Sequence, residues 1–154
     1  MSSNKGFTLL ELMVAIAIVA VMATITIPGW LSWRDSAKAR GAANSLKADF
    51  ERAKLRAVRE NSNVCVLFTG NTAYQIFTDP NEDSILGAGE DTIADRALPD
   101  GVSITGNTFS SSRMSFNARG IPDGSAGTVT LTSAGGRRYE VVVSPFGRVR
   151  TEED

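Results

Sequence analysis

The sequence predicts an α+β protein, in which a long N-terminal helix, apolar in its first half, packs on a C-terminal antiparallel β-sheet domain. Three observations lead to this prediction. Residues 7–27 form an apolar run with a single charge. Residues 30–60 carry apolar positions at helical spacing, and from residue 63 onward the apolar period changes to two. A helix followed by strands favours an antiparallel sheet that covers one face of the helix.

The composition limits the function before any motif is considered. The chain has 154 residues, of which 42% are hydrophobic and 21% are charged, so one folded domain is expected. It has no histidine and one cysteine, Cys65. Histidine-based catalytic triads, disulfides within the chain and zinc sites built from cysteine or histidine are therefore excluded. We expect no enzyme.

The apolar run of residues 7–27 has the length of a membrane span. As a helix with a rise of about 1.5 Å per residue it covers about 30 Å, the thickness of a bilayer core. A secretory signal peptide and a buried helix of a soluble protein are the alternatives. The run is longer than a typical signal-peptide core, is apolar on all sides and has no evident cleavage site behind it. A membrane-spanning helix is therefore favoured.

Two residues of this segment are unusual in a membrane helix. Glu11 lies inside the apolar run, where an ionised carboxylate costs several kcal/mol unless it is paired. No lysine or arginine occurs between Lys5 and Arg34, so we expect its partner to come from another molecule. Pro28 removes a backbone donor and should kink or locally melt the helix.

The motif Lys-Gly-Phe-Thr-Leu-Leu-Glu at residues 5–11 resembles the leader of type IV pilins and of the pseudopilins of type II secretion. The resemblance implies that prepilin peptidase cuts between Gly6 and Phe7. Residues 1–6 are then the leader peptide, and Phe7 becomes the N-methylated first residue of the mature subunit.

The same resemblance implies a location and a set of partners. Residues 7–29 would span the bacterial inner membrane once and later form the filament core. Residues 30–154 would form a globular domain in the periplasm. Other pilins or pseudopilins would be the partners in the filament, where Glu11 would meet the amino group of a neighbouring subunit. Pro28 lies where pilins often carry a helix-breaking proline.

The helix is expected to continue to about residue 60. Its charged face, which includes Asp49 and Lys54, is expected to be solvated. Its apolar positions form one stripe: Ala39, Ala42, Ala43, Leu46, Phe50, Ala53 and Ala57.

Strands are expected in the rest of the chain, with Cys65 as a small core residue. Gly70-Asn71 and Gly135-Gly136 predict hairpins, and Pro145-Phe146-Gly147 predicts a turn. The expected strands cover residues 64–68, 73–77, 102–105, 113–117, 128–132, 138–144 and 148–151.

The C-terminal part carries a second resemblance. Residues 116–120, Phe-Asn-Ala-Arg-Gly, together with residues 141–150, Val-Val-Val-Ser-Pro-Phe-Gly-Arg-Val-Arg, resemble the GspH/FimT class of minor pilins and pseudopilins. This resemblance implies a low-abundance subunit near the filament tip rather than the main repeating pilin.

An acidic segment has the spacing of a calcium-binding loop. Asp79, Asn81, Asp83 and Glu90 occupy positions one, three, five and twelve of an EF-hand-type pattern, which would gather oxygen ligands for Ca²⁺ around one point. Ser84 stands at the sixth position, where that pattern has a glycine, and no EF-hand helices are expected. A solvated acidic turn without a metal or other cofactor is the alternative.

Two arginines near the C-terminus suggest a nucleic-acid contact. Arg148 and Arg150 alternate on an expected edge strand, which would place both guanidinium groups on one face for a phosphate. Some FimT-like subunits of competence pili are thought to bind DNA through an arginine-bearing C-terminal segment of this kind. Against this, three acidic residues, 152–154, follow directly and would weaken the field.

Three functions remain open from the sequence. The first is a structural minor pilin or pseudopilin, and the second is a DNA receptor on a competence pilus. The third is a membrane-anchored periplasmic domain that is unconnected to filaments.

Overall fold

The computed structural model describes residues 6–87, 89–124 and 126–153, without the side chains of residues 25, 27 and 28. The chain divides into two compact units with the boundary between Arg34 and Asp35. The helix α1 (Leu9–Glu60) contributes to both units.

The first unit holds the apolar part of α1. One helix of the described chain is long and apolar enough to cross a membrane, with a mean hydropathy of 2.5 in its most apolar window and none of that window buried. The backbone stays helical through position 28, so the described backbone does not melt locally there. A proline removes only one intrahelical hydrogen bond, and the turns on either side keep theirs.

The second unit packs its core on the rest of α1. All seven positions of the predicted apolar stripe are buried, which confirms it. Phe50 lies at the centre of this core. Its ring contacts those of Phe68, Phe109 and Phe116 edge-on, with centroids 6.4, 6.2 and 6.3 Å away. Gly127 leaves room for this cluster, because a Cβ at that position would overlap the ring of Phe109.

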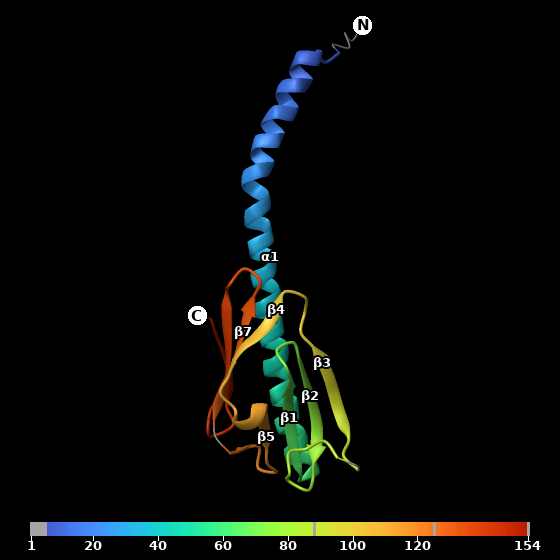
Figure 1. Ribbon diagram of the computed structural model, residues 1–154, viewed down its shortest axis with the longest axis vertical. Coiled ribbons are helices and arrows are strands. Elements are labelled where there is room, and N and C mark those ends of the chain that lie inside the picture. The colour runs from blue at the N-terminus through green and yellow to red at the C-terminus, as the bar shows by residue number, and fades with distance from the viewer. Residues whose placement is uncertain (1–5, 88, 125, 154) are drawn as a thin grey trace. The chain divides into compact units, whose positions relative to one another are not determined.

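Two antiparallel sheets lie beside the second half of α1 (Figure 1). The first has the order β3-β2-β1-β5-β6, and the second has the order β4-β7-β8-β9. The strands of the first sheet are β1 (Asn63–Thr69), β2 (Ala73–Asp79), β3 (Thr92–Ala97), β5 (Arg113–Phe116) and β6 (Pro122–Asp123). Those of the second are β4 (Val102–Asn107), β7 (Gly127–Ser133), β8 (Arg138–Val143) and β9 (Val149–Glu153), and a short 3-10 helix, η1 (Ser110–Ser112), precedes β5.

The predicted α+β class is confirmed, but the expectation of one sheet is wrong. The ladder of the first sheet ends at β6, which is two residues long and begins with Pro122, a residue without a backbone donor. The strands β3 and β6 were also not predicted. The sequence of β3 is Thr-Ile-Ala-Asp-Arg-Ala, which lacks the apolar alternation by which a half-buried strand is recognised.

The hairpin predictions are confirmed. β1 pairs with β2 from Asn63↔Asp79 to Thr69↔Ala73, and β7 pairs with β8. β1 is buried on both faces, so Cys65 lies in the interior as predicted. Burial and, secondly, the negative charge of Asp79 raise the pKa of the Cys65 thiol to about 12. The thiol is therefore an inert core group at neutral pH.

Candidate assembly site and ligand-binding loops

The N-terminus of α1 is closed by a side-chain cap. The hydroxyl oxygen of Thr8 accepts a hydrogen bond from the backbone N–H of Glu11 at 3.2 Å, and the Thr8 carbonyl accepts one from Leu12 at 3.2 Å. The sequence pattern Thr-x-x-Glu is typical of such a cap, but Thr8 was not predicted from the sequence as the capping residue. The cap places Glu11 in the first helical turn, where the helix dipole favours a negative charge.

The predicted cleavage site precedes this cap. Gly6 and Phe7 are outside the helix and exposed, and the Phe7 side chain is 81% exposed. The preceding residues 1–5 lie outside the described part of the chain. Glu11 is exposed as well, and no cation among the described residues lies within ion-pair distance of it. The expectation that a partner comes from another molecule therefore stays open.

The acidic segment brings three of its four predicted ligands together. One carboxylate oxygen from each of Asp79, Asp83 and Glu90 lies within 4.8 Å of the other two. Asp79 is fully buried, and its two oxygens accept the backbone N–H groups of Asp83 at 3.1 Å and Ser84 at 2.9 Å. Ser84 adopts a positive φ of 56°, so it makes the turn that a glycine makes in an EF-hand loop.

The remaining contacts of this loop bear on whether it suits a cation. The Glu90 Oε2 atom accepts the N–H of Gly87 at 2.8 Å, whereas its Oε1 atom is buried and lacks a hydrogen-bond partner in the described chain. The Asn81 side chain is bound to Asp83, donating to its carboxylate at 3.0 Å. Three carboxylates match the oxygen preference of Ca²⁺, which takes about six to eight ligands. The calcium site stays a prediction.

We expect calcium to raise the melting temperature of the full chain in detergent by roughly 5–10 °C at a hundredfold excess over its dissociation constant. Asp83→Asn should remove the increment, because it takes away one of the three candidate ligand carboxylates. Asp83 is the exposed one of the three, so the substitution should not disturb the core. Asp95→Asn, an acid on β3 outside this loop, is the matched control and should keep it. A shift that is equal with magnesium, or unchanged in Asp83→Asn, would leave the loop as an acidic turn.

The predicted edge strand at the C-terminus is β9, which is the outer strand of the second sheet. It begins at Val149, so Arg150 lies on the strand, whereas Arg148 lies just before it and not on it as expected. Arg148 and Arg150 are exposed on either side of the buried Val149. Arg150 forms an ion pair with Glu152, with 2.8 Å between its Nε atom and a carboxylate oxygen. The following acidic residues therefore neutralise part of this basic surface.

The turn before β9 is held in place by α1. The ammonium group of Lys54 donates to the Gly147 carbonyl at 2.8 Å, although the sequence placed this lysine on a solvated face. Gly147 has a φ of 74°, and a Cβ there would overlap the carbonyl oxygen of Gly120. Phe146 is 86% exposed at the tip of this turn.

Two families match this chain. Residues 1–27 match the prokaryotic N-terminal methylation motif, and residues 42–147, more than half of the chain, match the family described as type II transport protein GspH. The chain belongs to the type IV pilin and pseudopilin family, with a GspH domain.

Relatives of this pilin-family chain agree with its membership. It is 30% identical over 161 residues to the pilin-like protein PilA1 of Thermus thermophilus, an alignment that covers 97% of this chain and 99% of that protein. A shorter stretch of 45 residues is 42% identical to the type IV major pilin protein PilA of Myxococcus xanthus. That stretch covers 29% of this chain and 20% of the relative.

Solved structures share the fold of this pilin-family chain. The type IV minor pilin FimU of Pseudomonas aeruginosa superposes with a TM-score of 0.60 at 16% identity, covering 78% of this chain and 92% of that chain. The minor pseudopilin EpsH from the type 2 secretion system of Vibrio cholerae gives a TM-score of 0.58 at 10% identity, covering 75% and 97%. At these identities the likeness establishes the fold alone.

Family membership settles the broad class of function. The chain is a structural subunit and not an enzyme. Its methylation motif implies processing by prepilin peptidase and assembly with other pilins. The apolar helix behind that motif is consistent with an inner-membrane pilin before assembly.

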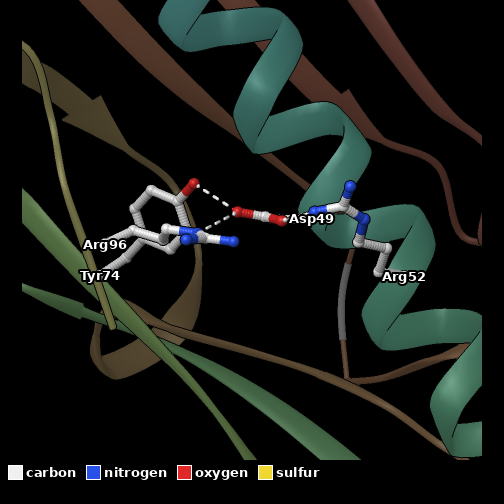
Figure 2. Close-up of polar contacts among 4 residues, drawn as sticks. All are labelled: Asp49, Arg52, Tyr74 and Arg96. Atoms are coloured by element: carbon white, nitrogen blue, oxygen red, sulfur yellow. Dashed lines mark hydrogen bonds and ion pairs between the residues drawn. The ribbon is translucent and has the colours of Figure 1, made fainter. Parts of the chain in front are cut away.

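A buried carboxylate joins α1 to the first sheet of this pilin domain (Figure 2). Asp49 is 3% exposed, although the sequence placed it on the solvated face of the helix. One of its oxygens accepts from the Tyr74 hydroxyl at 2.9 Å and from the Arg96 Nε atom at 3.2 Å. The other accepts from Arg52 at 3.1 Å. Asp49 thereby connects α1 to β2 and to the edge strand β3.

The environment keeps the Tyr74 hydroxyl protonated. Burial and, secondly, the negative charge of Asp49 raise the pKa of Tyr74 well above its ordinary value. The phenol therefore remains a hydrogen-bond donor to Asp49 at neutral pH. A charged acceptor with three donors is satisfied in this interior, which is the condition for burying a carboxylate.

Proposed function

We propose that this chain is a minor pilin or pseudopilin, held in the inner membrane by residues 7–29 with its globular domain, residues 30–154, in the periplasm. Prepilin peptidase removes residues 1–6 by cutting between Gly6 and Phe7, and Phe7 is methylated. The subunit is then assembled at or near the tip of a type IV pilus or a type II secretion pseudopilus. The observation that carries this proposal is that one chain combines the methylation motif, an exposed apolar helix and a GspH domain.

The geometry of the helix N-terminus supports an assembly role for Glu11. Cleavage before Phe7 creates a new amino group four residues from Glu11. The two carry opposite charges, and in the apolar core of a filament each needs a partner. The cap by Thr8 fixes the first turn, so the carboxylate is presented at a defined position. The amine of one subunit and the Glu11 carboxylate of its neighbour then form the pair.

We expect Glu11→Val and Glu11→Gln to reduce incorporation into filaments at least about tenfold, because each leaves the neighbour's ammonium group unpaired in an apolar environment. Membrane insertion should be unchanged or slightly better. Glu11→Gln keeps the helix cap, since the cap uses the backbone N–H of Glu11. The measurement compares sheared filaments with membranes by immunoblotting.

The control for this experiment is Met13→Leu, an exposed apolar exchange in the same part of α1. It should be incorporated like the wild type. Normal incorporation of Glu11→Gln would contradict the charge pair, whereas loss of both variants from membranes would indicate a defect before assembly.

We infer a second candidate function, a DNA-binding minor pilin of a competence pilus, from the C-terminal arginines. Arg148 is exposed and has no ion pair with a described residue. The turn beside it is held by the hydrogen bond from Lys54 to the Gly147 carbonyl. Exposed guanidinium groups suit the phosphates of DNA.

Changing Arg148 and Arg150 to glutamine should weaken binding of duplex DNA to the same extent for all sequences. The slope of log affinity against log salt should fall by about two, one for each lost phosphate contact. Deletion of residues 152–154 should tighten binding, because it removes the carboxylate that pairs with Arg150. Affinity that is unchanged in the double variant would leave a purely structural subunit.

A further inference from the structure

The chain has two tryptophans, and they lie together at the end of the apolar run. The ring centroids of Trp30 and Trp33 are 5.5 Å apart, and each side chain is 64% exposed. Leu31 between them is 44% exposed. Most large apolar side chains of a folded chain are buried, whereas both indoles are largely exposed among the described residues of their unit.

We propose that Trp30 and Trp33 form an interfacial anchor, which holds the indole pair at the boundary between the hydrocarbon and the headgroups of the bilayer and so sets the depth of α1. The proposal rests on the proposed membrane insertion of residues 7–29. It adds a defined depth and names the residues that set it.

The chemistry of the pair suits this boundary. An indole has a large apolar body and one N–H donor, and it is enriched where a helix passes from hydrocarbon to water. The sequence changes character at this point. The preceding segment is apolar, and its most apolar part is not buried in the protein. Charged residues follow within the next two turns: Arg34, Asp35, Lys38 and Arg40. The pair therefore lies where the apolar surface ends.

The depth has a consequence for Glu11. Trp30 follows Glu11 by nineteen residues in a continuous helix. At about 1.5 Å per residue the two are about 29 Å apart along the axis, which matches a hydrocarbon thickness of about 30 Å. With the indoles at one boundary, Glu11 lies at the other, where the cost of a charged side chain is much lower than at the centre.

The anchor therefore lowers the cost of placing the Glu11 carboxylate in the membrane before assembly. A shift of one helical turn, about 5.4 Å, would draw the carboxylate into hydrocarbon or the indoles into water. Both ends of the segment resist such a shift. The anchor holds the Glu11 side chain near the membrane surface, and it holds the Gly6–Phe7 bond outside the hydrocarbon.

Tryptophan fluorescence of the full chain reports on this pair alone, because the chain has no other tryptophan. The chain would be reconstituted in phosphatidylcholine vesicles whose acyl chains are brominated either near the headgroup or near the methyl end. We expect quenching by the shallow bromines to exceed quenching by the deep bromines at least about twofold. Stronger quenching by the deep bromines, or none by either in vesicle-bound protein, would overturn the anchor. Failure of the chain to float with vesicles would instead overturn membrane insertion itself.

A second measurement tests whether the pair sets the depth. Cysteines introduced by Gly29→Cys or Ser36→Cys would be labelled with a membrane-impermeant maleimide. The native Cys65 is buried and gives little background. In the wild-type background we expect Ser36→Cys to be labelled and Gly29→Cys to be protected. Replacing both tryptophans with leucine should reduce this difference at least about threefold, because the apolar surface then extends without a preferred boundary.

Matched variants separate this role from a protein contact. Tyrosine at both positions should restore the labelling difference, since tyrosine also prefers the interface. Met22→Leu, an exposed exchange in the same helix, should leave it unchanged. If the leucine pair keeps normal labelling but is lost from filaments, Trp30 and Trp33 contact another subunit, and the anchor is overturned.

Discussion

Gly6→Val is expected to leave the whole leader on the chain. Nothing lies within 4 Å of a Cβ at position 6, so the substitution should not disturb the fold or the helix cap. The loss should therefore arise in the peptidase, which by family resemblance cuts after this glycine. Gly6→Ala should be processed poorly, and Gly6→Val should not be processed. Intact mass measurement of the membrane-bound protein distinguishes the precursor from a product that starts at Phe7.

Gly41→Ala is the matched control for this prediction. It also places a Cβ in open space and should be processed normally. Alanine has the higher helix propensity, so this variant should be equally stable or slightly more stable. Normal processing of Gly6→Val would contradict the assignment of the cleavage site.

Asp49→Ala is expected to lower the free energy of unfolding by about 2–4 kcal/mol. The substitution leaves the buried Tyr74 hydroxyl without an acceptor and removes the ion pair that connects Arg96 on β3 to α1. Asp49→Asn keeps an acceptor without the charge and should cost less, about 1–2 kcal/mol. Chemical denaturation measures the loss, and hydrogen exchange should show that the protection of β3 amides falls first.

A double-mutant cycle with Tyr74→Phe separates the hydrogen bond from the rest of the contact. Asp49 and Tyr74 should show a coupling energy of about 1 kcal/mol or more. Glu51→Ala on the same helix is the control, and it should change stability by less than about 0.5 kcal/mol. An Asp49→Ala protein as stable as this control would contradict the structural role of the buried carboxylate.

The part of the fold that depends on periodicity could be predicted from the sequence. The apolar stripe of α1 and most strands follow from side-chain spacing, because a buried face repeats with the period of its element. β3 could not be predicted in this way. It is a polar edge strand, and its tie to the helix depends on Arg96 and Asp49, which are 47 residues apart. A local pattern contains no information about such a contact.

The candidate sites show the same division. The Thr-x-x-Glu signature at Thr8 was present in the sequence and predicts the cap that positions Glu11. Asp79, Asp83 and Glu90 of the acidic loop lie close together in the structure, and the calcium site that their spacing suggests stays a prediction. The sequence did not predict three side-chain contacts: Asn81 with Asp83, Lys54 with the Gly147 carbonyl, and Arg150 with Glu152. These depend on the rotamers and on the path of each turn.

The central claim is that this chain is processed and assembled into a filament. It is tested most directly by mass spectrometry of purified pili or pseudopili from cells that express the tagged wild-type chain. The account predicts that the chain is present at low abundance and that its first residue is N-methylated Phe7. An intact Met1, a mature N-terminus near Trp30, or complete absence of the chain from filaments would contradict it.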